Sequence, residues 1–141
     1  MSGRILCVDP GDARIGIAIS DLTGTIANPL TMIRHVSRLI DAAGIAMLAQ
    51  EQGAVLIVVG QPLDGDGKVG PAARKSVRTA EAIRLQTRLP VKLWDESGST
   101  QQAREARQAM GVKRSKRSGH LDELAATVIL QSYLDAHIKE G

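Results

Sequence analysis

The sequence predicts an α/β fold, in which helices flank a sheet that contains parallel strands. Two apolar runs, residues 4–9 and 55–59, are continuous rather than alternating, and this pattern is typical of strands buried on both faces. A stretch with apolar residues at helical spacing, residues 37–52, separates them. Because the run 55–59 follows a helix and is the most apolar run in the chain, it predicts a buried, parallel central strand.

The first half of the chain predicts two further strands before this helix. Residues 15–20 form the second strand of a hairpin, since Pro10-Gly11-Asp12 supplies a turn after the first strand. Residues 26–33 predict a weaker third strand, and Pro29 favours an edge position because proline cannot donate to a neighbouring strand. The helix over residues 37–52 ends at Gly53, a residue typical of helix C-termini.

The second half predicts helices and one more strand around the central run 55–59. A polar loop, residues 60–70, leads to a helix from Pro71 to Thr87. Residues 91–96 alternate in polarity and end in two carboxylates, which predicts a strand. A capping box predicts a short helix over residues 99–110. The last helix, residues 121–139, is apolar almost all round in its middle and is expected to pack directly on the sheet.

Length and composition are those of one globular domain over residues 1–141. The chain has enough residues to bury a hydrophobic core without disulfide or metal cross-links. Its single cysteine, Cys7, excludes an internal disulfide and a cysteine-rich zinc site. No apolar run approaches the roughly 18 residues of a membrane span, and a signal-peptide pattern is absent. We therefore expect a cytoplasmic protein without a membrane partner. The absence of Phe argues against an aromatic platform for single-stranded bases.

Basic side chains are concentrated in the second half of the chain. Residues 71–141 carry thirteen basic and eight acidic groups, against five and seven in residues 1–70, and this asymmetry points to a polyanionic partner. The helix over residues 71–87 places three basic residues on its outer side, where they form either a solvated face or contacts with phosphates: Arg74, Lys75 and Arg78. A loop whose sequence shows no periodic apolar pattern carries four more: Lys113, Arg114, Lys116 and Arg117. These four either contact a phosphate backbone or are simply exposed to solvent.

Three carboxylates occur at the ends of separate predicted elements. Asp9 ends the first strand, Glu96 ends the last strand, and Asp122 lies in the first turn of the last helix, where it could also serve only the helix dipole. A lone charge at the end of a buried run must be paired, solvated or metal-bound. Oxygen ligands from separate elements suit Mg²⁺ or Mn²⁺. Two such ions about 3.5–4 Å apart support phosphodiester hydrolysis, in which Arg14 would meet a phosphate.

Four sequence blocks, which occur in order and cover essentially the whole chain, resemble the YqgF/RuvX family. They are Asp9-x-Gly11-x-x-Arg14-Ile15-Gly16-x-Ala18, Val59-Gly60-x-Pro62-Leu63-x-x-Asp66-Gly67, Asp95-Glu96-x-x-Ser99-Thr100 and Asp122-x-x-Ala125-Ala126-x-x-Ile129-Leu130-x-x-Tyr133. Each block alone is a weak signal, whereas the four together are specific.

The resemblance implies a ribonuclease H-like fold: a five-stranded mixed sheet, three antiparallel strands followed by two parallel ones, flanked by helices. It also implies a cytoplasmic, metal-dependent endonuclease that processes the 5′ end of pre-16S ribosomal RNA, with ribosomal precursor particles as partners. The family was earlier described as a Holliday junction resolvase. By position, Asp9, Glu96 and Asp122 are its acidic triad.

Two positions depart from the family's usual pattern. Ser97 stands where the family usually has Arg, so a phosphate contact expected there is absent or is supplied by another residue. His120 stands where Lys is common, and it would touch the substrate, assist a metal-bound water or cap the helix.

The sequence leaves three classes of function open. The leading hypothesis is an endonuclease acting on structured RNA or branched DNA. The second is a non-catalytic nucleic-acid-binding factor in ribosome assembly. The third is an actin-like nucleotidase that uses the Asp-Pro-Gly hairpin as a phosphate turn, although a second such hairpin is lacking. No motif in this sequence distinguishes an RNA substrate from a DNA substrate, or a monomer from a homodimer.

Overall fold

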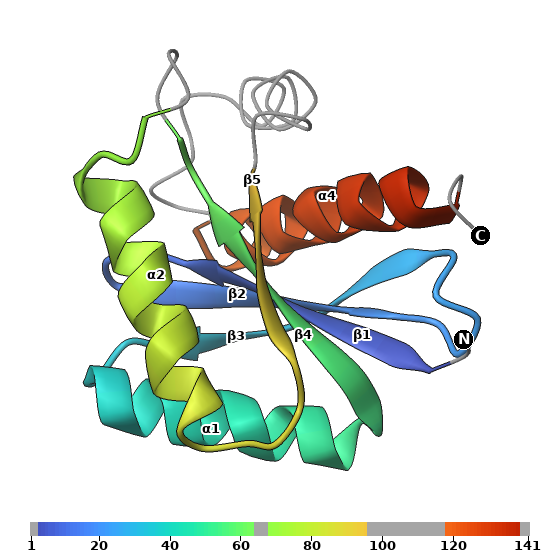
Figure 1. Ribbon diagram of the computed structural model, residues 1–141, viewed down its shortest axis with the longest axis horizontal. Helices are drawn as coiled ribbons and strands as arrows, with labels where there is room; N and C mark the ends of the chain where they lie inside the picture. Colours follow the sequence, from blue (N-terminus) through green and yellow to red (C-terminus); the bar gives the residue numbers. More distant parts are fainter. Residues whose placement is uncertain (1–2, 64–67, 96–117, 139–141) are drawn as a thin grey trace.

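The computed structural model describes residues 3–63, 68–95 and 118–138, with the side chains of the last segment described from residue 124 onward. The elements in chain order are β1 (Arg4–Pro10), β2 (Arg14–Ser20), β3 (Ala27–Arg34), α1 (Arg38–Glu51), β4 (Ala54–Gln61), α2 (Pro71–Arg84), β5 (Val91–Asp95) and α4 (Ser118–Ile138). The described strands form one sheet in the order β3-β2-β1-β4-β5 (Figure 1). The short helix predicted over residues 99–110 lies outside the described residues.

The sheet is mixed, as predicted. β1 pairs with β2, and β2 with β3, in antiparallel orientation, whereas β4 runs parallel to both β1 and β5. The predicted central position of β4 and edge position of β3 are confirmed. Pro29 faces Ala18 next to a register shift in the β2–β3 pair, where a missing backbone donor is tolerated.

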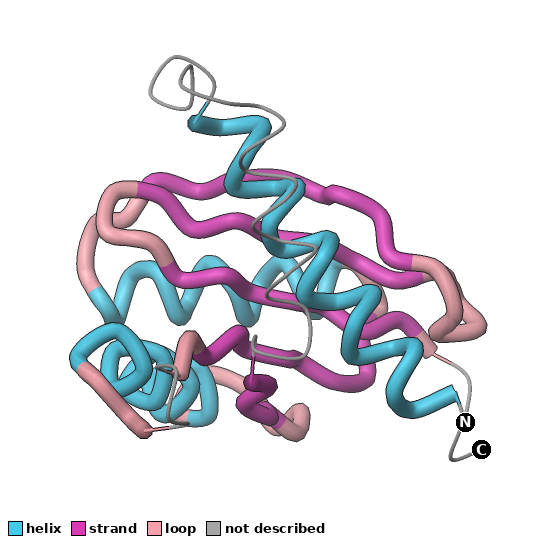
Figure 2. Tube along the Cα trace, turned by 90° about the horizontal axis from the view of Figure 1, so that it is seen from above, coloured by secondary structure: helices cyan, strands magenta, loops and turns pink. Residues whose placement is uncertain are grey.

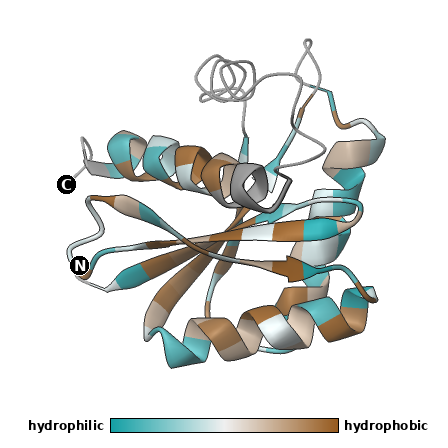
Figure 3. Cartoon of the chain, turned by 180° about the vertical axis from the view of Figure 1, so that it is seen from behind, coloured by the Kyte–Doolittle hydropathy of each residue, from teal (hydrophilic) through white to brown (hydrophobic). Residues whose placement is uncertain are grey.

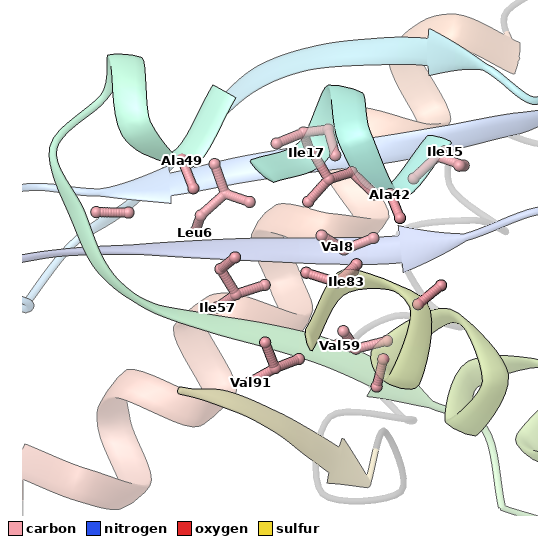
Figure 4. Packing of buried hydrophobic residues seen from close by; sticks show 14 of the residues in the cluster. Leu6, Val8, Ile15, Ile17, Ala42, Ala49, Ile57, Val59, Ile83 and Val91 are labelled. Atoms are coloured by element: carbon pink, nitrogen blue, oxygen red, sulfur yellow. The ribbon is translucent and has the colours of Figure 1, made fainter. Parts of the chain in front are cut away.

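Helices cover both faces of this sheet, with α1 and α2 on one face and α4 on the other (Figures 1 and 2). On the first face, the central strands pack against side chains of both helices, among them Ile83 (Figure 4). The strand residues are Leu6, Val8, Ile57 and Val59. The strands at the centre of the sheet are correspondingly apolar (Figure 3). Because successive strand residues point to opposite faces, this cluster defines which side of the sheet the residues of β1 and β2 occupy.

The second face of the sheet is covered by α4. The predicted packing of this helix directly on the sheet is confirmed. Five buried side chains of α4 contact Cys7, Ala18 and Val58 of the strands: Ala126, Ile129, Leu130, Tyr133 and Leu134. Gln131 accepts a hydrogen bond from the Ala27 amide (2.9 Å), and the Trp94 indole donates to Ser132 (3.2 Å). Within the described residues, no helix is long and apolar enough to cross a membrane.

Helix ends agree with the sequence signals to within about one turn. Ser37 caps α1 by accepting a hydrogen bond from the Ile40 amide (3.2 Å), and Gly53 follows the helix with a positive φ of 67°. Pro71 opens α2, which ends at Arg84, three residues before the predicted end. The last helix begins at Ser118, three residues before the predicted start.

Replacement of Leu130 by alanine tests the contact between α4 and the sheet. The side chain is fully buried, so we expect Leu130→Ala to lower the free energy of unfolding by about 2–5 kcal/mol. Leu85→Ala is the matched control, because 80% of the Leu85 surface is exposed, and a change within about 0.5 kcal/mol is expected. Urea unfolding measures both. Equal losses in the two variants would contradict the described packing of α4.

Candidate active site

Asp9 lies at the end of β1 and points to the face that α4 covers. Ile5 and Cys7 contact α4, and alternation along the strand places Asp9 on the same side. The residue is half-buried. A carboxylate in this setting is partly withdrawn from water, which strengthens its attraction for a cation.

Glycines occupy the strand positions on both sides of Asp9. Gly16 of β2 is its partner in the antiparallel register. Gly60 of β4 follows Val59, which pairs with Val8, so Gly60 is the neighbour of Asp9 in the parallel register. The sequence predicts Gly60 in a loop, whereas the structure places it in β4. Gly16, for which the sequence suggests a bend or a close approach by another backbone, lies in β2. The two strand positions that directly flank Asp9 therefore carry no side chain, an arrangement that fits a hydrated Mg²⁺ or Mn²⁺.

The parallel strands β1, β4 and β5 end at one edge of the sheet, which we call the carboxyl edge. Asp95 ends β5 and pairs with Gln61, the last residue of β4. It lies two strands from Asp9, a separation of about 10 Å at the usual strand spacing. Glu96 follows Asp95 directly in the chain and lies outside the described residues.

The direction of α4 brings its first turns toward the same edge. Near its C-terminus, Tyr133, Leu134 and His137 line a cleft together with Gly3 and Ile5 at the start of β1. The helix therefore runs opposite to β1, and its N-terminal part lies toward the end of β1 that carries Asp9. Asp122 and His120 belong to this part of α4. Their side chains lie outside the described ones.

In the part of the chain that the structure describes, no group of three or more His, Cys, Asp or Glu side chains is close enough together to hold a metal ion. Asp9 is the one member of the predicted triad whose side chain is described. The backbone thus brings the segments of Asp9, Asp95 and Asp122 to one region, while the ligand set Asp9, Glu96 and Asp122 stays a prediction.

Two arginines stand beside Asp9 on the α4 face. Arg14 is half-buried at the start of β2, two positions from the partner of Asp9 and on the same side of the sheet. Arg34, which no sequence pattern singles out, is exposed and lies directly opposite Arg14 in β3. Like charges directly opposite each other destabilise a sheet, and an anion held between them relieves that cost. Only the β2–β3 register reveals this pair, and no local sequence signal encodes it.

The basic residues of α2 divide into two kinds. Arg74 and Arg78 are exposed, as predicted. Lys75 does not follow the predicted outward orientation: it is half-buried and donates hydrogen bonds to the Gly11 carbonyl (2.7 Å) and the Asp12 carboxylate (2.8 Å). It thereby ties α2 to the β1–β2 turn. The predicted basic loop with Lys113, Arg114, Lys116 and Arg117, like Ser97, lies outside the described residues.

The backbone of the β1–β2 turn leaves no room for a side chain at Gly11. A Cβ added there would lie 2.2 Å from the Arg14 carbonyl oxygen, and a backbone atom in a sheet cannot move aside cheaply. The turn connects the strands of Asp9 and Arg14, so its geometry sets the relative position of these two residues.

Gly11→Ala should therefore lower the free energy of unfolding by about 1–3 kcal/mol, because the turn must distort. Gly44→Ala is the matched control: Gly44 lies inside α1 with nothing within 4 Å of an added Cβ, and a gain of about 0.5–1 kcal/mol is expected. Urea unfolding of the two variants checks the opposite signs. A Gly11→Ala variant as stable as the parent would rule out the close approach to Arg14.

Asp12, in the same turn, is electrostatically coupled to α2. The hydrogen bond and the charge of Lys75 lower the pKa of the Asp12 carboxyl below its ordinary value of 3.8, and the charge of His35 adds to this. A carboxyl with a lowered pKa stabilises the fold at pH values above its unfolded pKa, and this contribution is lost as the pH falls through the folded pKa. Asp12 is fully exposed, so the effect on stability is small.

Lys75→Met should raise the pKa of Asp12 toward 3.8. Asp21 provides an internal control, because its pKa is lowered by the amides of Thr25 and Ile26 and by the Thr23 hydroxyl, none of which the substitution touches. An NMR titration of the side-chain carboxyl signals between pH 2 and 6 follows both groups in one sample. If Asp12 titrates unchanged in the variant, the ion pair with Lys75 does not form in solution.

The sequence resembles known proteins over nearly its full length. Residues 3–136 match the family described as RuvX, Holliday junction resolvase. A protein of Caldanaerobacter subterraneus named "Putative pre-16S rRNA nuclease" is 41% identical over 134 residues, covering 94% of this chain and 96% of that protein. A protein of the same name from Syntrophus aciditrophicus is 42% identical over 137 residues, covering 97% and 91%.

A solved structure shares the fold at low sequence identity. Thermus thermophilus RuvC, in complex with a Holliday junction substrate, superposes with a TM-score of 0.63 at 15% identity and covers 97% of this chain and 96% of its own. This likeness confirms the predicted ribonuclease H-like fold. The relatives' names likewise bear out the predicted nuclease class, which implies a nucleic-acid substrate and a divalent metal ion. By the match over residues 3–136, this chain belongs to the RuvX family of nucleases.

Proposed function

We propose that this chain, acting as a single cytoplasmic domain over residues 1–141, is a metal-dependent endonuclease that processes the 5′ end of pre-16S ribosomal RNA. The names of relatives that match nearly the whole chain support the substrate. The observation that carries the chemistry is the position of Asp9: a half-buried carboxylate at the carboxyl edge, with a glycine on each neighbouring strand.

We assign Asp9, Glu96 and Asp122 as the ligands of two Mg²⁺ or Mn²⁺ ions. Such ions, when bound, lower the pKa of a coordinated water and stabilise the leaving oxygen of a phosphodiester. Asp9 contributes a carboxylate that is already fixed by the strand, so it needs little reorganisation on binding. The start of α4 adds the positive end of a helix dipole near the segment of Asp122, which favours ionised carboxylates there.

The basic residues hold the substrate in this proposal. Arg14 and Arg34, on the same face as Asp9, suit the oxygens of one backbone phosphate, since guanidinium groups bind phosphate in a bidentate manner. Arg74 on α2 and the loop residues Lys113, Arg114, Lys116 and Arg117 supply attraction that does not depend on base sequence. His120 contacts the substrate or assists the water from the start of α4.

Cleavage of a branched DNA junction is the second candidate. Two observations favour it: the description of the matching family and the shared fold with RuvC. A resolvase acts on two symmetric strands and would require a homodimer, whereas processing of an RNA end is within reach of a monomer. Family membership argues against the actin-like nucleotidase that the Asp-Pro-Gly hairpin suggested.

Asp9→Asn tests the mechanism. With Mg²⁺ or Mn²⁺, we expect the parent protein to cut an extended 16S precursor RNA, and we expect the variant to lose at least about a hundredfold in rate, because metal-assisted catalysis is worth several kcal/mol. Binding of the RNA should change little. The matched control is Glu51→Gln, which removes one exposed carboxylate at the end of α1, away from the carboxyl edge.

The measurement is a cleavage assay with the precursor RNA and a four-way DNA junction side by side, together with an RNA-binding titration. Cleavage that persists in Asp9→Asn would refute the assigned metal ligand. A parent protein that binds RNA yet cuts neither substrate would favour the non-catalytic assembly factor. Preferential cutting of the junction would exchange the first candidate for the second.

A further inference from the structure

A cationic cleft lies at the carboxyl edge on the face opposite to Asp9. It has a volume of about 340 Å³ and is formed between the β1–β2 turn, the start of α1 and the middle of α2. Pro10 and Gly11 belong to its lining, so the cleft begins one residue after Asp9. Asp9 faces α4, whereas the cleft opens on the side of α1 and α2.

The lining of the cleft carries three permanent positive charges and one carboxylate. The positive charges are those of Arg38, Lys75 and Arg78. The carboxylate, Asp41, is buried and engaged in the wall: it accepts a hydrogen bond from the Val36 amide (2.9 Å) and is paired with Nδ1 of His35. The cleft therefore presents an excess of positive charge to a ligand.

The positive groups are held in place with different strength. Lys75 is fixed by the Gly11 carbonyl and Asp12, so its charge is partly balanced at the rim. Arg38 and Arg78 are exposed, and neither forms a hydrogen bond or ion pair with another described residue. Two guanidinium groups whose donors have no partner among the described residues therefore line one cleft from two different helices.

The surrounding backbone favours the same ligand. The cleft contains Ser37, the N-cap of α1, so the positive end of the α1 dipole adds to the charge of the arginines. The His35 amide donates to the Ala13 carbonyl (2.9 Å), which holds this corner against the β1–β2 turn. A concave site lined by guanidinium groups, which can bind in a bidentate manner, suits a tetrahedral oxyanion.

We propose that this cleft binds a backbone phosphate of the nucleic-acid substrate, at a distance from the bond that is cut. The source of the phosphate rests on the proposed function. A strand held at Asp9 on one face reaches the cleft by crossing the β1–β2 turn, because both sites adjoin the end of β1. The cleft thus fixes the direction in which the strand leaves the active site.

The test compares Arg38→Gln/Arg78→Gln with the control Arg88→Gln/Lys92→Gln in the full chain. Both variants remove two positive charges, but Arg88 precedes β5 by three residues and Lys92 is the second residue of that strand, so both lie at the opposite edge of the sheet. Binding of a fluorescent precursor RNA is measured by anisotropy without divalent metal at several salt concentrations. We expect the magnitude of the slope of log K against log[salt] to be smaller by about 0.7–0.9 in the cleft variant, which is the value for one phosphate contact. The control should keep the parental slope.

Equal slopes in the cleft variant and the control would overturn the proposal. A second experiment distinguishes free phosphate from a backbone phosphate of the nucleic acid. Inorganic phosphate is titrated into the parent protein, and the side-chain N–H signals of Arg38 and Arg78 are followed by NMR. Perturbed signals combined with an unchanged RNA slope would identify a site for free phosphate and overturn a contact with the nucleic acid. Circular dichroism melts check folding, which exposed arginines without described partners should not affect.

The two proposals fail in different ways. A parent that cuts no substrate but shows the loss of slope in the cleft variant would refute the nuclease and leave the cleft in place. Loss of cutting in Asp9→Asn, together with an unchanged slope in the cleft variant, would refute the cleft and leave the nuclease.

Discussion

The arrangement of this molecule depends on the parallel pairing of β1 with β4. Cys7 pairs with Val58 and Val8 with Val59, and the same direction continues into β5. Parallel strands end at one edge, so the residues that follow them meet there although they are far apart in sequence. An antiparallel β4 would place Gly60 and the segment of Asp95 at the opposite edge from Asp9. The candidate site is thus a direct product of the strand direction.

The alternation of side chains along β1 separates two tasks at this edge. Leu6 and Val8 fill the core under α1 and α2, while Cys7 and Asp9 face α4. The turn after β1 contributes to both faces of the sheet. It leads to Arg14 on the α4 face, and on the other face its Gly11 carbonyl accepts a hydrogen bond from Lys75. A shift of this turn would therefore change the acidic site and the cationic cleft together.

Local patterns were sufficient for the strands and helices that the structure describes, because continuous apolar runs, alternation and helical spacing are each visible in the sequence. The continuous run in β4 predicted its central place, and Pro29 predicted the edge place of β3. The orientation of Lys75 was not predictable, since its partners Gly11 and Asp12 lie more than sixty residues earlier and only the packing of α2 against the turn brings them together. Arg34, His35 and Arg38 escaped for the same reason: their relevance arises from pairing and packing, not from a local motif.

The distribution of charge follows from this geometry rather than from the net charge of +3. Arginines flank the end of β1 on both faces, Arg14 and Arg34 on the α4 side and Arg38 and Arg78 on the other. Asp9, between them, has glycines at the flanking positions of both neighbouring strands, and it is the carboxylate of this face that the proposed function assigns to the metal ions. Positive charge on both sides of a carboxylate attracts a polyanion toward a metal-binding group, which is the combination that metal-assisted cleavage of a nucleic acid requires.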